Sequence, residues 1–310
     1  MVARLRTEWL HLRKHRELAI LSLPALVWMV IFSYAPMIGL VIAFKRYRYD
    51  LGIFGSQWVG FKNFEFFFTS RVAGVVTRNT VLHNLGFFFL TTFCAVTLAI
   101  LLNEVRRGSV KLYQTAMFLP YFLSWVVVSY IGLAFLGYRQ GYLNQARALL
   151  ALDPVRWYFE PRYWSYVLNA VNLRKNVGFS TLIYYAGIMG IDPACHEAAK
   201  VDGASEWQLL RHVTLPLLLL LGIVLFILSL GSIFHGDFGL FFFVPNNSSF
   251  LFAVTDIIDT YVCRSLTQIS GLGMGTAVGL YQSIGGLILI GVTNAIIHRI
   301  NPKRALWLPA

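Results

Sequence analysis

Residues 18–44 read LAILSLPALVWMVIFSYAPMIGLVIAF, a run of 27 residues without a charged side chain. A helix needs roughly 18 to 20 predominantly apolar residues to cross the hydrocarbon core of a bilayer, and this run exceeds that length. Five further runs also reach it, and within them only Arg174 and Lys175 are charged. These runs cover residues 85–103, 112–138, 163–191, 213–236 and 265–297. The sequence therefore predicts an all-α polytopic membrane protein with six transmembrane helices.

The composition excludes a soluble globular domain. Of the 310 residues, 57% are hydrophobic and 13% are charged, whereas soluble domains contain about 25% charged residues. The apolar runs do not alternate polar and apolar residues as membrane β-strands do. The three cysteines fall in an expected span and in two loops on opposite sides of the membrane, so we expect no disulfide. They are Cys94, Cys195 and Cys263.

The distribution of cationic residues predicts the orientation. Five Lys and Arg residues lie in the first 16 positions, and cytoplasmic segments of membrane proteins carry an excess of such residues. With six spans both termini lie on this side, where the expected segments hold 13 Lys and Arg against 11 in the outer loops. We therefore expect a basic cytoplasmic tail at 1–17, an uncleaved six-span domain at 18–298, and a second cytoplasmic tail at 299–310.

Three outer loops follow from this topology, at residues 45–84, 137–162 and 237–274. In the first, phenylalanines crowd the partly polar stretch 61–68, which indicates a segment lying in the membrane interface. In the second, residues 142–152 predict a short helix that Asp-Pro closes.

The most polar stretch between two apolar runs covers residues 191–216 and reads IDPACHEAAKVDGASEWQLLRHVTLP. Asp192 is a good helix N-cap, and Pro193 suits the first helical position because its missing N–H would have no partner there. Gly203 then allows a tight turn. A second short helix is expected at 204–212, so the sequence predicts two short helices joined at a glycine across the membrane face.

The spacing within this stretch resembles a known motif. Glu197-Ala198-Ala199, then Gly203, then Leu215-Pro216 resembles the EAA loop of the permease subunits of bacterial ABC importers, with valine where isoleucine is usual at residue 213. The resemblance implies the type I importer permease fold, with this loop docked in a cleft of a cytosolic ATPase. The ATPase-coupling residues that it implies are Glu197, Ala198, Ala199, Asp202, Gly203, Leu215 and Pro216.

Other segments resemble the carbohydrate branch of these permeases, and in particular the permeases for oligosaccharides cut from polysaccharides, including those of the alginate importer. The segments are 58–64, 78–80, 118–120, 175–179, 235–240 and 255–262. The chain departs from the pattern at a few positions, since tryptophan is expected at Arg174, tyrosine at Cys263 and a bulky pair at Cys195-His196.

The resemblance implies a transport subunit and not an enzyme. The chain has no Gly-x4-Gly-Lys-Ser/Thr loop, so ATP and Mg are expected on a partner, and no cofactor or metal on this chain. The seven histidines are dispersed without ligand spacing. The implied partners are a second homologous permease subunit, a dimer of ATPase subunits, an extracytoplasmic solute-binding protein, the oligosaccharide and membrane lipid. The implied location is the bacterial inner membrane, and no nucleic acid is expected. The alternatives are a secondary transporter and an intramembrane enzyme.

Charge in the fourth apolar run indicates an acidic substrate. A buried cation near mid-membrane is costly, so Lys175 should face a polar pathway, a partner subunit or backbone carbonyls. Asn169, Asn172 and Asn176 share a helix face nearby, and the outer loops carry four more cations than acids. We expect a uronate-type oligosaccharide, with a neutral oligosaccharide as the alternative. The expected pathway residues are Asn172, Lys175, Asn176, Tyr184, Asp237, Asp256 and Asp259.

Overall fold

The computed structural model describes residues 16–267 and 271–300. Most of both expected tails, residues 1–15 and 301–310, lies outside this part of the chain. The all-α prediction is confirmed: the only strands of the described part are β1 (Lys45–Arg46) and β2 (Gln57–Trp58). They pair antiparallel with Lys45 opposite Trp58.

Four stretches of the described residues are helical, long and apolar enough to cross a membrane. They are Ile20–Phe44, Arg71–Glu104, Glu206–Gly231 and Leu272–Ala295. The first combines α2 (Arg16–Met29), a π segment η1 (Val30–Tyr34) and a 3-10 segment η2 (Ala35–Phe44). The others contain α5 (Arg71–Glu104), α12 (Leu215–Gly231) and α16 (Leu272–Ile300). The expected number of six is therefore not confirmed by length and apolar character alone.

The third apolar run is not one straight helix, which corrects the prediction. It folds as α6 (Arg107–Phe118), the 3-10 turn η3 (Leu119–Phe122) and α7 (Trp125–Leu136), and α7 is bent by 95° from the preceding helix. Pro120 lies in the turn and cannot donate a helical hydrogen bond. Ser124 then starts α7 by accepting a hydrogen bond from the backbone N–H of Val127. If the bent pair crosses the bilayer as one span, it is a fifth candidate.

The fourth run forms α9 (Trp164–Met189), a 26-residue helix with two cations at its middle. The sixth span begins later than expected, because residues 265–267 belong to α15 (Ile258–Thr267) and α16 starts at Leu272. The third outer loop is also largely helical and contains α13 (Phe238–Phe243), η7 (Ser249–Leu251), α14 (Phe252–Thr255) and α15.

Shorter helices complete the fold. The first loop contains α3 (Gly52–Gly55) and α4 (Lys62–Thr69), so the interfacial stretch is helical. The second contains α8 (Tyr142–Leu149), which starts where predicted but ends before the predicted end at residue 152, followed by η4 (Trp157–Phe159) and η5 (Pro161–Tyr163). The polar stretch between the fourth and fifth runs holds α10 (Pro193–Val201), α11 (Glu206–Leu209) and the π segment η6 (Leu210–Thr214).

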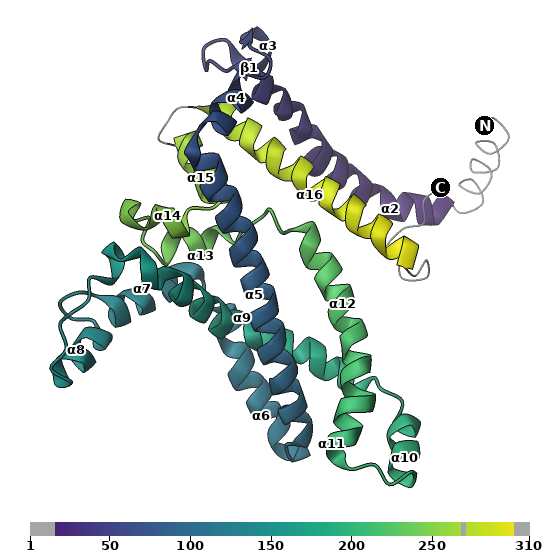
Figure 1. Ribbon diagram of the computed structural model, residues 1–310. Helices are drawn as coiled ribbons and strands as arrows, with labels where there is room; N and C mark the ends of the chain where they lie inside the picture. The colour runs from purple at the N-terminus through teal and green to yellow at the C-terminus, as the bar shows by residue number, and fades with distance from the viewer. Residues whose placement is uncertain (1–15, 268–270, 301–310) are drawn as a thin grey trace.

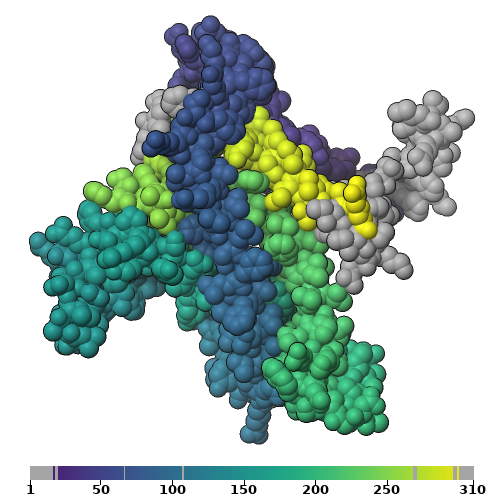
Figure 2. Space-filling model, in the orientation of Figure 1, coloured from purple at the N-terminus to yellow at the C-terminus, as the bar shows by residue number. Residues whose placement is uncertain are grey.

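The helices diverge from a common centre instead of closing into a compact bundle. In Figure 1, α5, α9 and α12 form the centre, the pair of α2–η2 and α16 runs away from it, and α7 with α8 extends in another direction. In the space-filling view of Figure 2, the pair of α2–η2 (purple) and α16 (yellow) projects from the rest of the molecule. The strongly apolar window of the first stretch has no buried residue, as expected of a surface that lipid or a partner subunit covers.

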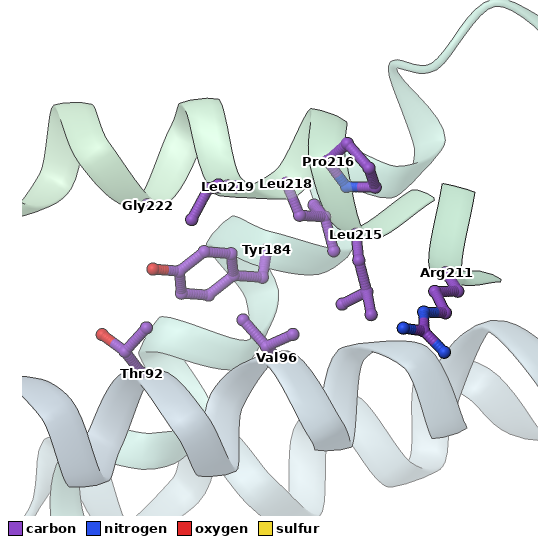
Figure 3. Close-up of a pocket in the computed structure, with 9 residues that line it drawn as sticks. All are labelled: Thr92, Val96, Tyr184, Arg211, Leu215, Pro216, Leu218, Leu219 and Gly222. Carbon is purple, nitrogen blue, oxygen red and sulfur yellow. The ribbon is translucent and has the colours of Figure 1, made fainter. Parts of the chain in front are cut away.

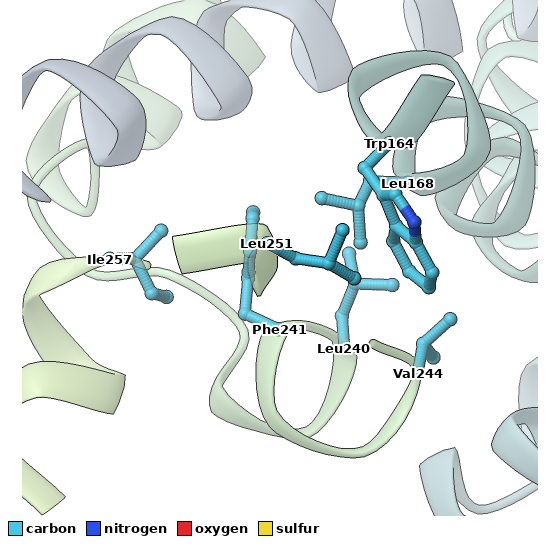
Figure 4. Packing of buried hydrophobic residues seen from close by; sticks show 7 residues of the cluster. All are labelled: Trp164, Leu168, Leu240, Phe241, Val244, Leu251 and Ile257. Atoms are coloured by element: carbon cyan, nitrogen blue, oxygen red, sulfur yellow. The ribbon is translucent and has the colours of Figure 1, made fainter. Parts of the chain in front are cut away.

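The largest cluster of buried side chains in the described part of the chain lies where the start of α9 meets the helical third loop. Figure 4 shows Trp164 and Leu168 of α9 packed against side chains of residues 240–257. The indole N–H of Trp164 donates to the backbone carbonyl of Trp157 at 2.7 Å, so this large side chain is buried without an unsatisfied donor. This core fixes the third loop over the start of α9, the helix that carries Lys175.

Candidate functional site

The polar loop that connects α9 with α12 folds locally as its sequence predicts. The side chain of Asp192 accepts a hydrogen bond from the backbone N–H of Ala194 at 2.9 Å and so caps α10. Gly203 follows α10 with φ +79°, a left-handed conformation that side chains disfavour. Its N–H donates to the Lys200 carbonyl at 3.0 Å. The chain therefore reverses direction at the predicted glycine.

The second half of this loop differs from the prediction. Instead of a separate helix at 204–212, α11 continues through η6 into α12, so Pro216 lies in the first turn of α12 but within a helical path that runs from Glu206 to Gly231. Ser205 and Gln208 form a capping box at the start of α11. Because the helical path has no break, a force on α11 acts directly on the membrane helix.

The implied coupling residues lie on an accessible tip. Glu197, Ala198, Asp202, Gly203 and Pro216 are exposed, while Ala199 is half-buried and Leu215 is at the limit of exposure. In Figure 1, α10 and α11 form the end of the molecule farthest from α3 and α4. Two contacts join the arms of the loop, since His196 Nε2 lies 3.4 Å from the Thr214 hydroxyl and Lys200 Nζ lies 3.4 Å from Glu206. The tip is therefore accessible, and its two arms are held together.

Lys175 of α9 extends its side chain to the bend between α6 and α7. Its ammonium group donates to the backbone carbonyls of Tyr121 and Leu123 at 2.6 and 2.7 Å, at the break where helical hydrogen bonding stops. The same nitrogen lies 5.4 Å from the centre of the Tyr121 ring and 5.1 Å from that of Trp125, within reach of cation–π attraction. Backbone carbonyls, one of the partners that the sequence left open, are thus the contacts found.

Two glycines allow the close packing around this bend. A Cβ atom at Gly178 of α9 would overlap the backbone carbonyl of Met117 in α6. A Cβ atom at Gly239 of α13 would overlap the indole ring of Trp125 in α7. The family-like segment that contains Lys175 therefore serves in part to bring α9 against the broken helix.

Aromatic rings stack between the bend and α9. The rings of Phe118, Tyr121 and Phe179 are stacked, with centroids 4.9 to 6.1 Å apart. Tyr121 and Phe179 are partly open to the surroundings. Asn172 and Asn176 share one face of α9 as predicted, because the Asn176 amide donates to Asn172 at 2.8 Å.

Asp237 belongs to the same site through Trp125. The Trp125 indole N–H donates to Asp237 Oδ2 at 2.7 Å. The other carboxylate oxygen accepts from the backbone N–H groups of Gly239 and Leu240 and so caps α13. The bend, the cation and the third outer loop are therefore joined in one chain of contacts.

Asp256 and Asp259 are not brought to this site. Asp256 is buried and forms an ion pair with Arg264 and a 2.7 Å hydrogen bond with Thr260. Burial raises the pKa of Asp256 above its usual value, and the neighbouring Arg264 guanidinium opposes that shift. Asp259 accepts from the Gly236 N–H at 2.7 Å and from the Gln282 side chain at 3.0 Å. Sequence reasoning missed Arg264, although residues 256, 260 and 264 share helical spacing.

Tyr184 is also separate from the bend. Figure 3 shows it between α5 and α12, beside a largely apolar cavity of about 390 Å³. This cavity reaches the loop at residues 191–216, which is called the coupling loop below. Its hydroxyl is buried and has no hydrogen-bond partner among the described residues. Nine residues along α9 separate it from Lys175, about 13 Å of helix. Arg174 is exposed and borders two apolar cavities of about 510 and 480 Å³, of which Lys175 borders only the first.

Comparisons with known proteins show which family the whole chain resembles. No protein-family model matches the chain. The chain is 33% identical over 296 residues to the polygalacturonan/rhamnogalacturonan transport system permease protein YteP of Bacillus subtilis, across 94% of this chain and 90% of that protein. It is 27% identical over 208 residues to the trehalose/maltose transport system permease protein MalF of Thermococcus litoralis, across 66% of this chain and 70% of that protein.

A solved structure agrees over almost the whole chain. The crystal structure of a bacterial ABC transporter involved in the import of the acidic polysaccharide alginate contains a chain that matches with a TM-score of 0.85 and 30% sequence identity. The match covers 95% of this chain and 99% of that chain. A second crystal structure shows an alginate transporter in complex with an alginate pentasaccharide-bound periplasmic protein, with a TM-score of 0.83 and 30% identity across 94% and 97% of the two chains.

Proposed function

Because this chain belongs to the permease subunits of sugar ABC transporters, we propose that it forms half of the membrane pathway of an ATP-driven importer. The substrate is an oligosaccharide, which a solute-binding protein delivers at the outer face of the inner membrane. A second permease subunit supplies the other half, and a dimer of ATPase subunits supplies the energy. The open arrangement of the helices supports a subunit that needs partners to complete its surface.

The coupling loop is the proposed ATPase contact. It is exposed, rigidly turned at Gly203 and continuous with α12, so closure of an ATPase cleft around α10 would move a membrane helix. Glu197 lies on the accessible face of α10, where it would pair with a basic group of the ATPase. This assignment places the loop and both chain termini in the cytoplasm.

The proposal that the oligosaccharide is acidic depends on Lys175. An ammonium group has three N–H donors, and two of them point to the carbonyls of Tyr121 and Leu123. The third is the proposed contact to a ligand. Lys175 forms no salt bridge among the described residues, although the Asp237 carboxylate attracts its charge from beyond ion-pair distance. Partly open aromatic rings beside it offer faces on which sugar rings can stack. A uronate oligomer has both chemistries, a carboxylate and a stackable ring face.

A neutral oligosaccharide is the second candidate, and one observation favours it. The carbonyl contacts already satisfy most of the hydrogen-bonding capacity of Lys175, so the cation has a structural role without any carboxylate. Amides at Asn172 and Asn176 could bind sugar hydroxyls of either class. The two candidates differ only in what the third N–H contacts.

The test is ATP hydrolysis by the complete importer in lipid nanodiscs with its solute-binding protein. We expect a uronate oligomer to stimulate hydrolysis more than a neutral oligomer of the same length. Glu197→Lys should remove the stimulation by weakening contact with the ATPase, while Glu65→Lys, a charge reversal at an exposed position of α4 in the first outer loop, is the matched control. Normal stimulation in complexes carrying Glu197→Lys would contradict the docking assignment, and equal stimulation by both sugars would favour the neutral candidate.

A further inference from the structure

The segment between α7 and α9 contains a hairpin, residues 138–157, whose two arms are cross-linked by hydrogen bonds. We call it the α8 hairpin. Asn144 is its buried centre, with an amide that donates to the carbonyls of Tyr138 at 3.0 Å and Val155 at 2.9 Å. The amide oxygen accepts from the Val155 backbone N–H at 3.0 Å and from the Trp157 indole at 3.2 Å. One side chain thus joins both arms of the hairpin, which fixes its shape.

The tip of this rigid hairpin consists of leucines. Leu149, Leu150 and Leu152 are 89%, 72% and 48% exposed. The turn around them is held by Arg147, whose carbonyl accepts from the Leu152 N–H at 2.9 Å and whose side chain donates to the Asp153 carbonyl at 2.9 Å. A polar loop in water has no reason to hold adjacent leucines at its most exposed point, so the tip is built to be covered.

The charges and rings around the tip indicate what covers it. The α8 hairpin contains three arginines and one acid, and none of these arginines belongs to a salt bridge in the described part of the chain. They are Arg139, Arg147 and Arg156. Tyr138 and Tyr142 are exposed beside them. Leucines with arginine and tyrosine around them match the layers of a membrane surface, where acyl chains lie beneath anionic headgroups and aromatic residues lie between.

The connections of the α8 hairpin keep it near the bilayer. It starts two residues after α7 ends at Leu136 and leads into α9 at Trp164, so both of its ends are attached to the membrane domain. An eight-residue helix is about 12 Å long, which does not carry the tip away from the membrane interface. In Figure 1, α8 turns back from α7 toward the level of α9, whereas α3 and α4 extend to the far end of the molecule.

We propose that the α8 hairpin is a monotopic membrane anchor. Its leucine tip enters the leaflet at the outer end of α7, and its arginines bind the headgroups of anionic phospholipids. The anchor holds the end of α7, and with it the geometry of the broken helix that Lys175 caps. This lipid contact does not depend on which sugar the importer carries, so the two proposals can fail separately.

The test measures the depth of a nitroxide label at the tip in the complete importer. Leu150→Cys is labelled in nanodiscs of phosphatidylglycerol and phosphatidylethanolamine, in a background whose native cysteines are replaced by serine. Asp153→Cys, three residues further on, is the matched control. We expect the Leu150 label to collide with oxygen more often than with a water-soluble nickel chelate, and the Asp153 label to show the reverse. Removing phosphatidylglycerol should shift the Leu150 label toward the nickel chelate, and Arg139→Gln should reduce that dependence on anionic lipid.

Two results would overturn the proposal. If the Leu150 label is as open to the nickel chelate as the Asp153 label, the tip lies in water. If it is protected from both oxygen and nickel, a protein covers it, either the second permease subunit or the solute-binding protein. Both positions are exposed in the fold, so labelling does not require repacking of the core.

Discussion

Replacing Lys175 with methionine separates the two roles of this residue. The change keeps a long unbranched side chain but removes the ammonium group that contacts the carbonyls of Tyr121 and Leu123. Loss of those two contacts weakens the bend whatever the substrate is. Loss of the third N–H matters only for a substrate with a carboxylate. A comparison of two substrates therefore isolates the interaction with the carboxylate, as a thermodynamic cycle does.

The expected size of the effect follows from this geometry. A hydrogen bond to a charged group contributes about 1.5 to 3 kcal/mol, and about 1.4 kcal/mol corresponds to a factor of ten. Lys175→Met should therefore lower uptake of a uronate oligomer about tenfold to a hundredfold more than uptake of a neutral oligomer of equal length. The assay is initial uptake into vesicles that contain the complete importer, with its binding protein at saturation.

Arg174→Met is the matched control, since it removes the neighbouring cation, which borders the same cavity but forms no hydrogen bond with the carbonyls of the bend in the described part of the chain. It should leave the ratio of the two uptake rates nearly unchanged. If Lys175→Met lowers both rates by the same factor, the residue only holds the bend and does not contact a substrate carboxylate.

Gly203→Pro should uncouple ATP hydrolysis from uptake while the protein still inserts, because proline cannot adopt φ +79° and removes an N–H that donates to a carbonyl; unchanged uptake per ATP would contradict the role of the turn. Arg264→Met should destabilise the fold by about 3 to 5 kcal/mol at neutral pH, since it leaves a buried carboxylate unpaired. Burial raises the pKa of Asp256 in the folded protein above its value in the unfolded chain. As pH rises between these two pKa values, the unfolded chain ionises first and the folded state loses stability. The loss in Arg264→Met should therefore be smaller near pH 5, and thermal unfolding in detergent that shows equal losses would exclude this coupling. Gly178→Ala should separate α9 from α6 and lower the thermal stability by about 1 to 3 kcal/mol; an unchanged transition would show that the two helices need no close approach.

The sequence predicted the features that follow from local chemistry. Residues 192 and 193 cap and start α10, and Gly203 turns the chain with a positive φ. These outcomes depend on a few neighbouring atoms, which a short stretch of sequence specifies. The all-α class follows in the same way from the length of the apolar runs.

Features that depend on contacts between distant segments were not predicted. The bend after Pro120 looked like the middle of a continuous apolar run, and its carbonyls are capped from α9 by Lys175, more than 50 residues away. The pairing of Asp256 with Arg264 is local, at a separation of eight residues, but it depends on a buried turn that Thr260 helps to form. Tyr184 shares a helix with Lys175 but faces another cavity, which only the packing of α5 and α12 decides.

The proposed function is the passage of a sugar through this chain with energy from ATP. The most direct test is uptake of a labelled uronate oligosaccharide into vesicles that contain the chain, its permease partner and the ATPase subunits. We predict accumulation only when ATP is present on the side of the coupling loop and the loaded solute-binding protein on the other. Accumulation that needs neither ATP nor the binding protein, and that an ion gradient drives instead, would show that the chain is not part of an ATP-driven importer.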